Sequence, residues 1–281
     1  MSKVWMISGA SRGIGLEMAR AALRAGHSVV ATGRRAEAVE AALSGEQGAL
    51  LTVALDVTRG DQIAAAVEMA VSRFGRIDVL VNNAGYGQLG LFEECSAEEV
   101  RQQFDTNVFG LMALTRAVLP VMRRQRGGHL FNITSIGGLL GAPAGSLYCA
   151  SKFAVEGFSE SLAAELADFG IGITLVEPGY FRTDFLDERS LRYGTRRIAD
   201  YAQRSTELEQ YYKSHSHRQA GDPVKLASAL LQLSEAPAKP LRFCAGTDAV
   251  GMIAQKLASL QAELDAWRNL SVSTDGDFGA A

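Results

Sequence analysis

The sequence predicts an α/β fold in which helices cover both faces of a doubly wound, mainly parallel β-sheet of about seven strands. Three observations lead to this fold class. Short runs rich in Val, Ile and Leu recur along the chain, segments with a helical repeat of apolar residues lie between them, and no linker or internal repeat interrupts this alternation over the 281 residues. Strands that alternate with helices form right-handed crossovers, which places a ligand crevice beyond the carboxyl ends of the strands.

The candidate strands are recognised by a nearly continuous apolar composition, because a strand that is buried on both faces has no polar side. Six segments show this pattern, at residues 3–7, 28–32, 50–55, 78–82, 129–134 and 172–177. We expect each of them to be a strand of one sheet.

The helices are recognised by apolar residues that return every three or four positions. The clearest example is residues 14–26, where Leu16, Ala19 and Leu23 form one apolar stripe and Gly26 supplies a stop signal. This helix directly follows the first candidate strand, so the two begin a strand–helix–strand unit.

We expect one domain over residues 1–281, because no Pro- or Ser-rich linker and no shift in composition divides the chain. Two segments depart from the regular alternation. Residues from about 180 to 220, here called the lid segment, are charged and aromatic, and we expect them to cover the crevice as a substrate lid. Residues from about 247 to 270 have a strong helical pattern and form a predicted C-terminal extension.

Composition and charge exclude several classes of function. The formal net charge of -3 leaves no basic excess for binding nucleic acid, and the N-terminal apolar run is too short for a signal peptide or a membrane span. The spacing of Cys95, Cys149 and Cys244 is typical of reduced thiols, so we expect a cytoplasmic protein without a membrane partner. His215 and His217 lie in a polar run without a third suitable ligand nearby, and we expect no metal site.

A glycine-rich loop follows the first candidate strand. The sequence SGASRGIG, residues 8–15, places Gly9, Gly13 and Gly15 between that strand and a helix. Glycines allow the backbone to approach a pyrophosphate closely, and the helix N-terminus offers free N–H groups and a favourable dipole. Glycines in a tight turn are often structural only, but this position favours nucleotide binding and a Rossmann-type domain.

Tyr148 and Lys152 lie in the sequence LYCASKF, residues 147–153, at a spacing that places both side chains on one face of a helix. An ammonium group close to a phenol favours the phenolate and lowers the phenol pKa from about 10, which would allow proton exchange near neutral pH. Such pairs also occur on helix surfaces for packing and solvation alone. The pair by itself therefore leaves both interpretations open.

Several further motifs occur in order at regular spacing. They are SGASRGIG at residues 8–15, NNAG at residues 82–85, Ser135 after a strand, YCASK at residues 148–152 and EPG at residues 177–179. Together they resemble the short-chain dehydrogenase/reductase family over roughly the first 180 residues, and their coincidence is far more specific than any single motif. Ser8 stands where the family more usually has Thr, and the hydroxyl group is retained.

The resemblance implies the roles of the site residues. The implied catalytic residues are Asn107, Ser135, Tyr148 and Lys152, with Tyr148 as the general acid in reduction and the general base in oxidation. Ser135 would donate to the substrate oxygen, Lys152 would bind the nicotinamide ribose, and Asn107 would hold a water that leads to Lys152. The expected cofactor-binding residues are Gly9, Ser11, Arg12, Gly13, Ile14, Gly15, Gly33, Arg34, Arg35, Asp56, Val57, Asn83, Ala84, Gly85, Tyr148, Lys152, Pro178, Gly179 and Thr183.

The end of the second candidate strand predicts NADP(H) as the cofactor. An acidic residue there would hydrogen-bond the ribose 2′-OH of NAD and repel a 2′-phosphate. This chain has Gly33 at that position, followed by Arg34 and Arg35, and Arg12 lies in the glycine loop. Arginines at a helix start also serve solvation, but the missing acid and the converging guanidinium groups favour a phosphate.

The sequence therefore predicts an NADP(H)-dependent oxidoreductase that transfers hydride between the nicotinamide and a carbonyl or secondary alcohol. A 3-oxoacyl thioester is an alternative substrate class, and a catalytically silent NADPH-binding sensor or scaffold is an alternative function. Relatives pair through helices that correspond to residues 98–122 and 148–168, which implies a homodimer or homotetramer. Aromatic residues in or near the lid segment are expected to form the substrate wall: Tyr180, Phe181, Phe185, Tyr193, Tyr201, Tyr211 and Tyr212.

Overall fold

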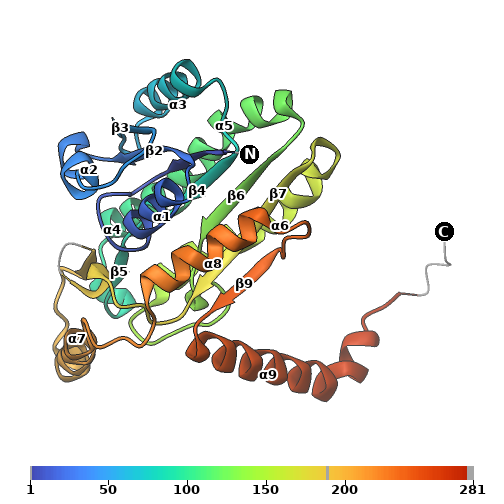
Figure 1. Cartoon of the computed structure of the whole chain (residues 1–281). Coiled ribbons are helices and arrows are strands. Elements are labelled where there is room, and N and C mark those ends of the chain that lie inside the picture. The colour runs from blue at the N-terminus through green and yellow to red at the C-terminus, as the bar shows by residue number, and fades with distance from the viewer. Residues whose placement is uncertain (1, 188–189, 277–281) are drawn as a thin grey trace.

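Seven parallel strands form the central sheet, in the order β3-β2-β1-β4-β6-β7-β9. The computed structural model describes residues 2–187 and 190–276, and Figure 1 shows helices on both sides of the sheet. The strands are β1 (Val4–Ile7), β2 (Ser28–Gly33), β3 (Leu50–Ala54), β4 (Val79–Asn82), β6 (Gly128–Ile133), β7 (Ile171–Pro178) and β9 (Arg242–Ala245). The predicted α/β fold class is confirmed, and six of these strands lie at the six predicted segments.

The seventh strand, β9, is the one that the apolar pattern did not locate. It has only four residues, RFCA, and it pairs with β7 alone, at the edge of the sheet. Its first three residues are half-buried, so an uninterrupted apolar run is not required.

The two faces of the sheet are covered by different helices. On one face lie α1 (Gly13–Arg24), α2 (Ala36–Leu43) and α8 (Pro223–Glu235), and on the other lie α3 (Gly60–Phe74), α5 (Leu111–Gln125) and α6 (Ser146–Leu166). Strand β1 shows how the side chains are divided. Trp5 and Ile7 belong to the core with α1 and α8, whereas Met6 belongs to the core with α3, α5 and α6. Alternate residues of a strand point to opposite faces, so both faces of β1 are buried.

A continuous helical segment leads from α4 (Ala97–Phe104) into α5. The helix α4 begins with a capping box, in which Ser96 accepts a hydrogen bond from the backbone of Glu99 and the Glu99 side chain accepts one from the backbone of Ser96. Between α4 and α5, residues Asp105–Gly110 form a π-helical turn. Such turns widen the backbone and often occur at functional sites.

The lid segment leaves the sheet after β7 and returns before α8. It contains β8 (Leu191–Tyr193), which pairs in parallel with β5 (Gly87–Leu89), and the helix α7 (Ala202–His215). Its two ends are joined, because Arg182 N donates to the Gly221 carbonyl at 2.8 Å and Gly221 N donates to the Tyr180 carbonyl at 3.0 Å. The excursion is therefore a closed loop that is fixed at its base.

The last helix, α9 (Thr247–Val272), follows β9 and extends away from the body, as Figure 1 shows in red. Within the part of the chain that the structure describes, α9 and the other helices are all too short or too polar to cross a membrane.

Truncation of a core residue provides a test of the fold. Leu80 in β4 is fully buried, and we expect Leu80→Ala to reduce the free energy of unfolding by about 2–5 kcal/mol, because the substitution leaves a cavity. Met69→Ala is the control, since Met69 on α3 is 44% exposed and its truncation should change stability by about 0.5 kcal/mol or less. Urea unfolding followed by circular dichroism measures both, and equal losses would contradict the assigned core.

Candidate active site

A cavity of about 600 Å³ opens at the carboxyl ends of the central strands. It begins at the glycine loop after β1 and continues to Tyr148 on α6, beside the point where the chain order in the sheet reverses. Most predicted site residues line it: Gly9, Ser11, Arg12, Gly13, Ile14, Gly33, Arg34, Asp56, Val57, Asn83, Ala84, Gly85, Ser135, Tyr148, Lys152, Pro178, Gly179 and Thr183. Gly15, Arg35 and Asn107 are not part of the lining.

The glycine loop has the geometry of an anion-binding turn. Gly9 and Gly13 have φ values of 68° and 58°, which other residues adopt rarely. The helix α1 begins at Gly13 without an acidic residue in its first turn, so its positive end remains available to a phosphate. Gly15 serves packing instead, because a Cβ there would lie 2.4 Å from the Asn83 side-chain nitrogen.

Hydrogen bonds join the glycine loop to the NNAG turn. The hydroxyl of Ser8 accepts hydrogen bonds from the backbone N–H groups of Asn83 and Ala84, both at 3.0 Å. In return, the Asn83 side-chain nitrogen donates to the carbonyl oxygens of Ser8 and Gly9, at 3.0 and 3.1 Å. A hydroxyl at position 8 is sufficient for this role, which explains why Ser can replace the more usual Thr.

The basic residues near β2 have different surroundings. Arg34 and Arg35 are exposed, and neither guanidinium group has a hydrogen-bond or ion-pair partner among residues 2–187 and 190–276. Arg34 lines the cavity and Arg35 does not. Arg12 extends toward the lid segment, where it donates a hydrogen bond to the Ser190 hydroxyl at 2.7 Å.

Asp56 is the acidic residue next to this region. Its carboxylate accepts hydrogen bonds from the backbone N–H and the hydroxyl of Thr58, at 2.9 and 2.7 Å. Asp56 therefore closes the turn after β3, while β2 ends in Gly33 without a carboxylate.

Tyr148, Lys152 and Ser135 meet at the other end of the cavity. Tyr148 and Lys152 lie one turn apart on α6, and the Lys152 Nζ is 5.7 Å from the centre of the Tyr148 ring. Lys152 is buried, and its Nζ donates a hydrogen bond to the Ile133 carbonyl oxygen at the end of β6, at 2.8 Å. Ser135 follows β6 and lines the same cavity as Tyr148, and its hydroxyl accepts a hydrogen bond from Gly137 N at 3.0 Å.

Burial controls the protonation of this group. It raises the pKa of Tyr148 to about 12, although the neighbouring Ser135 hydroxyl acts in the opposite direction. Burial also lowers the pKa of Lys152 to about 8, although the nearby Glu156 acts to raise it. The net shift of the Tyr148 pKa is therefore upward, because burial dominates it. The Lys152 ammonium group donates to the Ile133 carbonyl oxygen, and a lowering of the Tyr148 pKa by Lys152 stays a prediction.

Asn107 lies in the π-helical turn, behind the cavity wall. Its side-chain nitrogen donates to the Tyr86 carbonyl at 2.9 Å and to the Ser151 hydroxyl at 3.3 Å, and its side-chain oxygen accepts from Tyr86 N at 3.1 Å. The side chain thus connects the segment after NNAG to α6, close to Tyr148. Its predicted role in holding a water stays a prediction.

The lid segment supplies an apolar wall. The ring centres of Phe185 and Tyr148 are 5.6 Å apart, and Tyr180, Phe181 and Tyr212 also line the cavity. The other aromatic residues expected there do not line it: Tyr193, Tyr201 and Tyr211. Sequence reasoning also missed several apolar lining residues, namely Leu191 in the lid segment and Leu89, Ile136, Leu140 and Met252 elsewhere in the chain.

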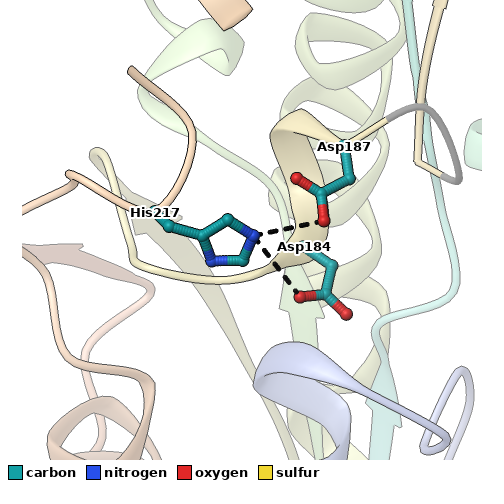
Figure 2. A group of neighbouring side chains, drawn as sticks. All are labelled: Asp184, Asp187 and His217. Atoms are coloured by element: carbon teal, nitrogen blue, oxygen red, sulfur yellow. Dashed lines mark hydrogen bonds and ion pairs between the residues drawn. The ribbon is translucent and has the colours of Figure 1, made fainter. Parts of the chain in front are cut away.

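A polar cluster holds the base of the lid segment, as Figure 2 shows. His217 Nε2 lies 3.2 Å from an Asp187 oxygen and 4.0 Å from an Asp184 oxygen, and the Ser216 hydroxyl donates to Asp187 at 2.6 Å. The sequence-based interpretation found no third ligand near His217, because the two aspartates lie about 30 residues earlier. The 3.2 Å contact is a direct hydrogen-bonding distance, and the predicted absence of a metal stays a prediction.

Comparison with known proteins supports the family that the sequence motifs indicate. A family model described as short chain dehydrogenase matches residues 3–194. The oxidoreductase BOA17 of Botryotinia fuckeliana is 39% identical over 276 residues, which cover 98% of this chain and all of the relative. The 3-ketodihydrosphingosine reductase of Bacteroides thetaiotaomicron is 39% identical over 247 residues, which cover 87% of this chain and 88% of the relative.

A solved structure is similar over nearly the whole chain. A short-chain dehydrogenase from Streptomyces avermitilis superposes with a TM-score of 0.89 at 40% identity, over 98% of this chain and 100% of the other. Sequence motifs, sheet topology and these similarities agree. The chain belongs to the short-chain dehydrogenase/reductase family of oxidoreductases, which bind nicotinamide cofactors.

Proposed function

We propose that the protein is an NADP(H)-dependent oxidoreductase that transfers hydride between the nicotinamide and a carbonyl or secondary alcohol, with Tyr148 as the general acid and base. One observation carries this proposal. Tyr148, Ser135 and Lys152 line the same cavity as the glycine loop, so a proton donor and a dinucleotide-binding turn share one space.

The protein residues would divide the chemistry as follows. The bound nicotinamide supplies or accepts the hydride, and Tyr148 supplies or accepts the proton on the substrate oxygen. Ser135 donates a hydrogen bond to the same oxygen and stabilises the negative charge that develops there. A phenol whose pKa is about 12 is protonated near neutral pH, so Tyr148 would enter carbonyl reduction as the proton donor.

The preference for NADP(H) rests on the cations beside Gly33. Arg34 lines the cavity, is exposed and has no partner within the described residues, so its guanidinium group is available to a 2′-phosphate. The positive end of α1 suits the pyrophosphate of the same molecule. Arg12 lines the same cavity, and its guanidinium group donates to the Ser190 hydroxyl of the lid segment.

The proposed substrate is a ketone, aldehyde or secondary alcohol with an apolar body. Phe185 provides apolar surface beside the proposed acid, Leu191 and Met252 add apolar surface in the same cavity, and Tyr180 and Tyr212 add hydroxyl groups. The similarity to 3-ketodihydrosphingosine reductase supports a ketone as the reacting group. A spectrophotometric screen of ketones and aldehydes with NADPH and NADH tests class and cofactor together, and tight NADPH binding without turnover of any carbonyl would favour the sensor.

We also propose that the protein acts in the cytoplasm as a homodimer or homotetramer. Phe109 in the π-helical turn is 57% exposed and Phe153 on α6 is 46% exposed. Both lie on the helical segments through which the resemblance implies pairing, and exposed aromatic side chains are typical of interfaces.

Removal of the phenol oxygen tests the proposed acid. We expect Tyr148→Phe to lower kcat for carbonyl reduction by at least about 100-fold, because a general acid contributes roughly that much, while NADPH binding is retained. Tyr211→Phe is the matched control, since Tyr211 does not line the cavity. Steady-state kinetics and NADPH fluorescence titration measure the two effects, and an active Tyr148→Phe protein would refute the assignment.

Arg34→Ala tests the cofactor preference. We expect NADPH binding to weaken about tenfold and NADH binding to change little, because only NADPH carries the 2′-phosphate. Arg35→Ala should have a smaller effect, since Arg35 is not part of the cavity lining. Fluorescence titration with both coenzymes gives the ratio of Kd values, and equal weakening of NADPH and NADH would contradict the phosphate contact.

The pKa of Lys152 predicts a pH profile. Because burial lowers this pKa to about 8, the ammonium form is present below that pH and is lost above it. Tyr148 remains protonated over the same range, since its pKa is about 12. We therefore expect kcat/KM for carbonyl reduction to fall as the pH rises through about 8. A profile that stays flat well above this value would show that the charge of Lys152 is not required.

A further inference from the structure

The helix α9 carries an apolar stripe along most of its length. The stripe residues follow one another at spacings of four, four, three, four and three positions: Ala249, Ile253, Leu257, Leu260, Leu264 and Trp267. At 3.6 residues per turn, these spacings keep the side chains on one narrow face. Apolar residues at alternating spacings of three and four positions are typical of the face by which one helix packs against another in a coiled coil.

The body covers only the beginning of this stripe. Ala249 and Ile253 are buried and pack with Ile136 in a small core beside β9. In contrast, every residue from 257 to 276 is exposed. Leu257 is 61% exposed and Trp267 is 64% exposed, and Figure 1 shows α9 extending beyond the body. The first turns of this face of α9 are therefore part of a core. No other part of the described residues covers the later turns.

We propose that a second copy of this chain covers the uncovered part of the stripe, through antiparallel pairing of two α9 helices over residues 257–272. With the crossing point at residue 262, Leu257 lies opposite the partner subunit's Trp267. Leu260 then lies opposite the partner subunit's Leu264. Both helices use the same four residues, so the contact is reciprocal, as a twofold interface requires. The proposal does not depend on the catalytic function.

The position of the body determines the antiparallel direction. At Ala249 and Ile253 the stripe faces the body, and further along the same face is open. In a parallel pair, both sheet-and-helix bodies would lie at the N-terminal end of the paired helices. The body of the partner would then occupy the space of the first α9 helix. In an antiparallel pair the two bodies lie at opposite ends, and only the uncovered parts overlap.

Size and charge favour a second copy over a lipid surface. The uncovered part has 16 residues and is about 24 Å long, so pairing would bury on the order of 1,000 Å², near the lower limit for a specific interface. Its charged residues are Glu263, Asp265 and Arg268, of which Asp265 and Arg268 already form an ion pair at 2.5 Å. A helix that binds membranes has a basic polar face, which this part of α9 lacks.

Charge placed on the stripe should break the contact. We expect the double variant Leu260→Glu, Leu264→Glu to have half the mass of the wild-type assembly in light scattering coupled to gel filtration at the same concentration. Ala262→Glu is the matched control, because residue 262 lies on the opposite face of the same helix and should leave the mass unchanged. Far-UV circular dichroism and NADPH binding verify that each variant is folded.

Spin labels test the direction of pairing in the wild-type stripe. Labels on Gln255→Cys and Ala262→Cys are introduced into a Cys244→Ser background, since Cys95 and Cys149 are buried. In the antiparallel pair, the two labels at 255 lie about 21 Å further apart along the helix axis than the two at 262. A parallel pair gives similar distances at both positions.

Three outcomes would overturn the proposal. One is a stripe variant with the wild-type mass, and another is similar label distances at both positions. The third is a wild-type protein whose α9 binds vesicles of phosphatidylcholine and phosphatidylserine and loses this binding with Leu260→Glu, Leu264→Glu while the mass stays unchanged. Halved mass in the stripe variant, unchanged mass in the control and unequal label distances together support the paired helices.

Discussion

The hydroxyl of Ser8 fixes the arrangement on which the rest of the site depends. Strands β1 and β4 are neighbours in the sheet, and both end where the chain must turn away and leave backbone groups unpaired. Ser8 satisfies the N–H groups of Asn83 and Ala84, and the Asn83 amide satisfies the carbonyls of Ser8 and Gly9. The two turns are thereby held as one unit, with the positive end of α1 facing the cavity. Gly15 is required because any side chain there would collide with Asn83.

At the far end of the cavity, a buried lysine is surrounded by compensating groups. An isolated buried ammonium group is unfavourable, and Lys152 is stabilised by the Ile133 carbonyl and by the charge of Glu156 one turn further along α6. Burial raises the pKa of Glu156 to about 7, while Arg242 on β9, 3.2 Å away, acts to lower it. The edge strand therefore contributes to the electrostatics of a site that it does not line. Tyr148, one turn before Lys152 on α6, is half-buried at this end of the cavity, and a partly desolvated position is suited to proton transfer.

The cavity combines walls from three parts of the chain. The sheet and α6 provide the polar end, the lid segment provides Phe185 and Tyr212, and Met252 comes from the first turns of α9. Asp248 at the start of α9 also accepts a hydrogen bond from Tyr180 N at 2.7 Å. The helix that we propose to pair with a second copy is thus attached directly to the substrate wall. Helix α9 would then both shape the substrate cavity, through its first turns, and pair with a second copy, through residues 257–272.

The sequence by itself determined the fold class, six of the seven strands and the family, because these follow from local periodicity and from motifs whose order is preserved along the chain. It also identified most of the residues that line one cavity, from Gly9 to Thr183, since the carboxyl ends of parallel strands converge, although Gly15, Arg35 and Asn107 lie outside the lining. Tertiary structure alone decided the edge strand β9, the contribution of Met252, and the meeting of His217 with Asp184 and Asp187. It also decided that the Tyr148 pKa is raised, because burial and the direction of the Lys152 ammonium group depend on contacts between segments that no local pattern encodes.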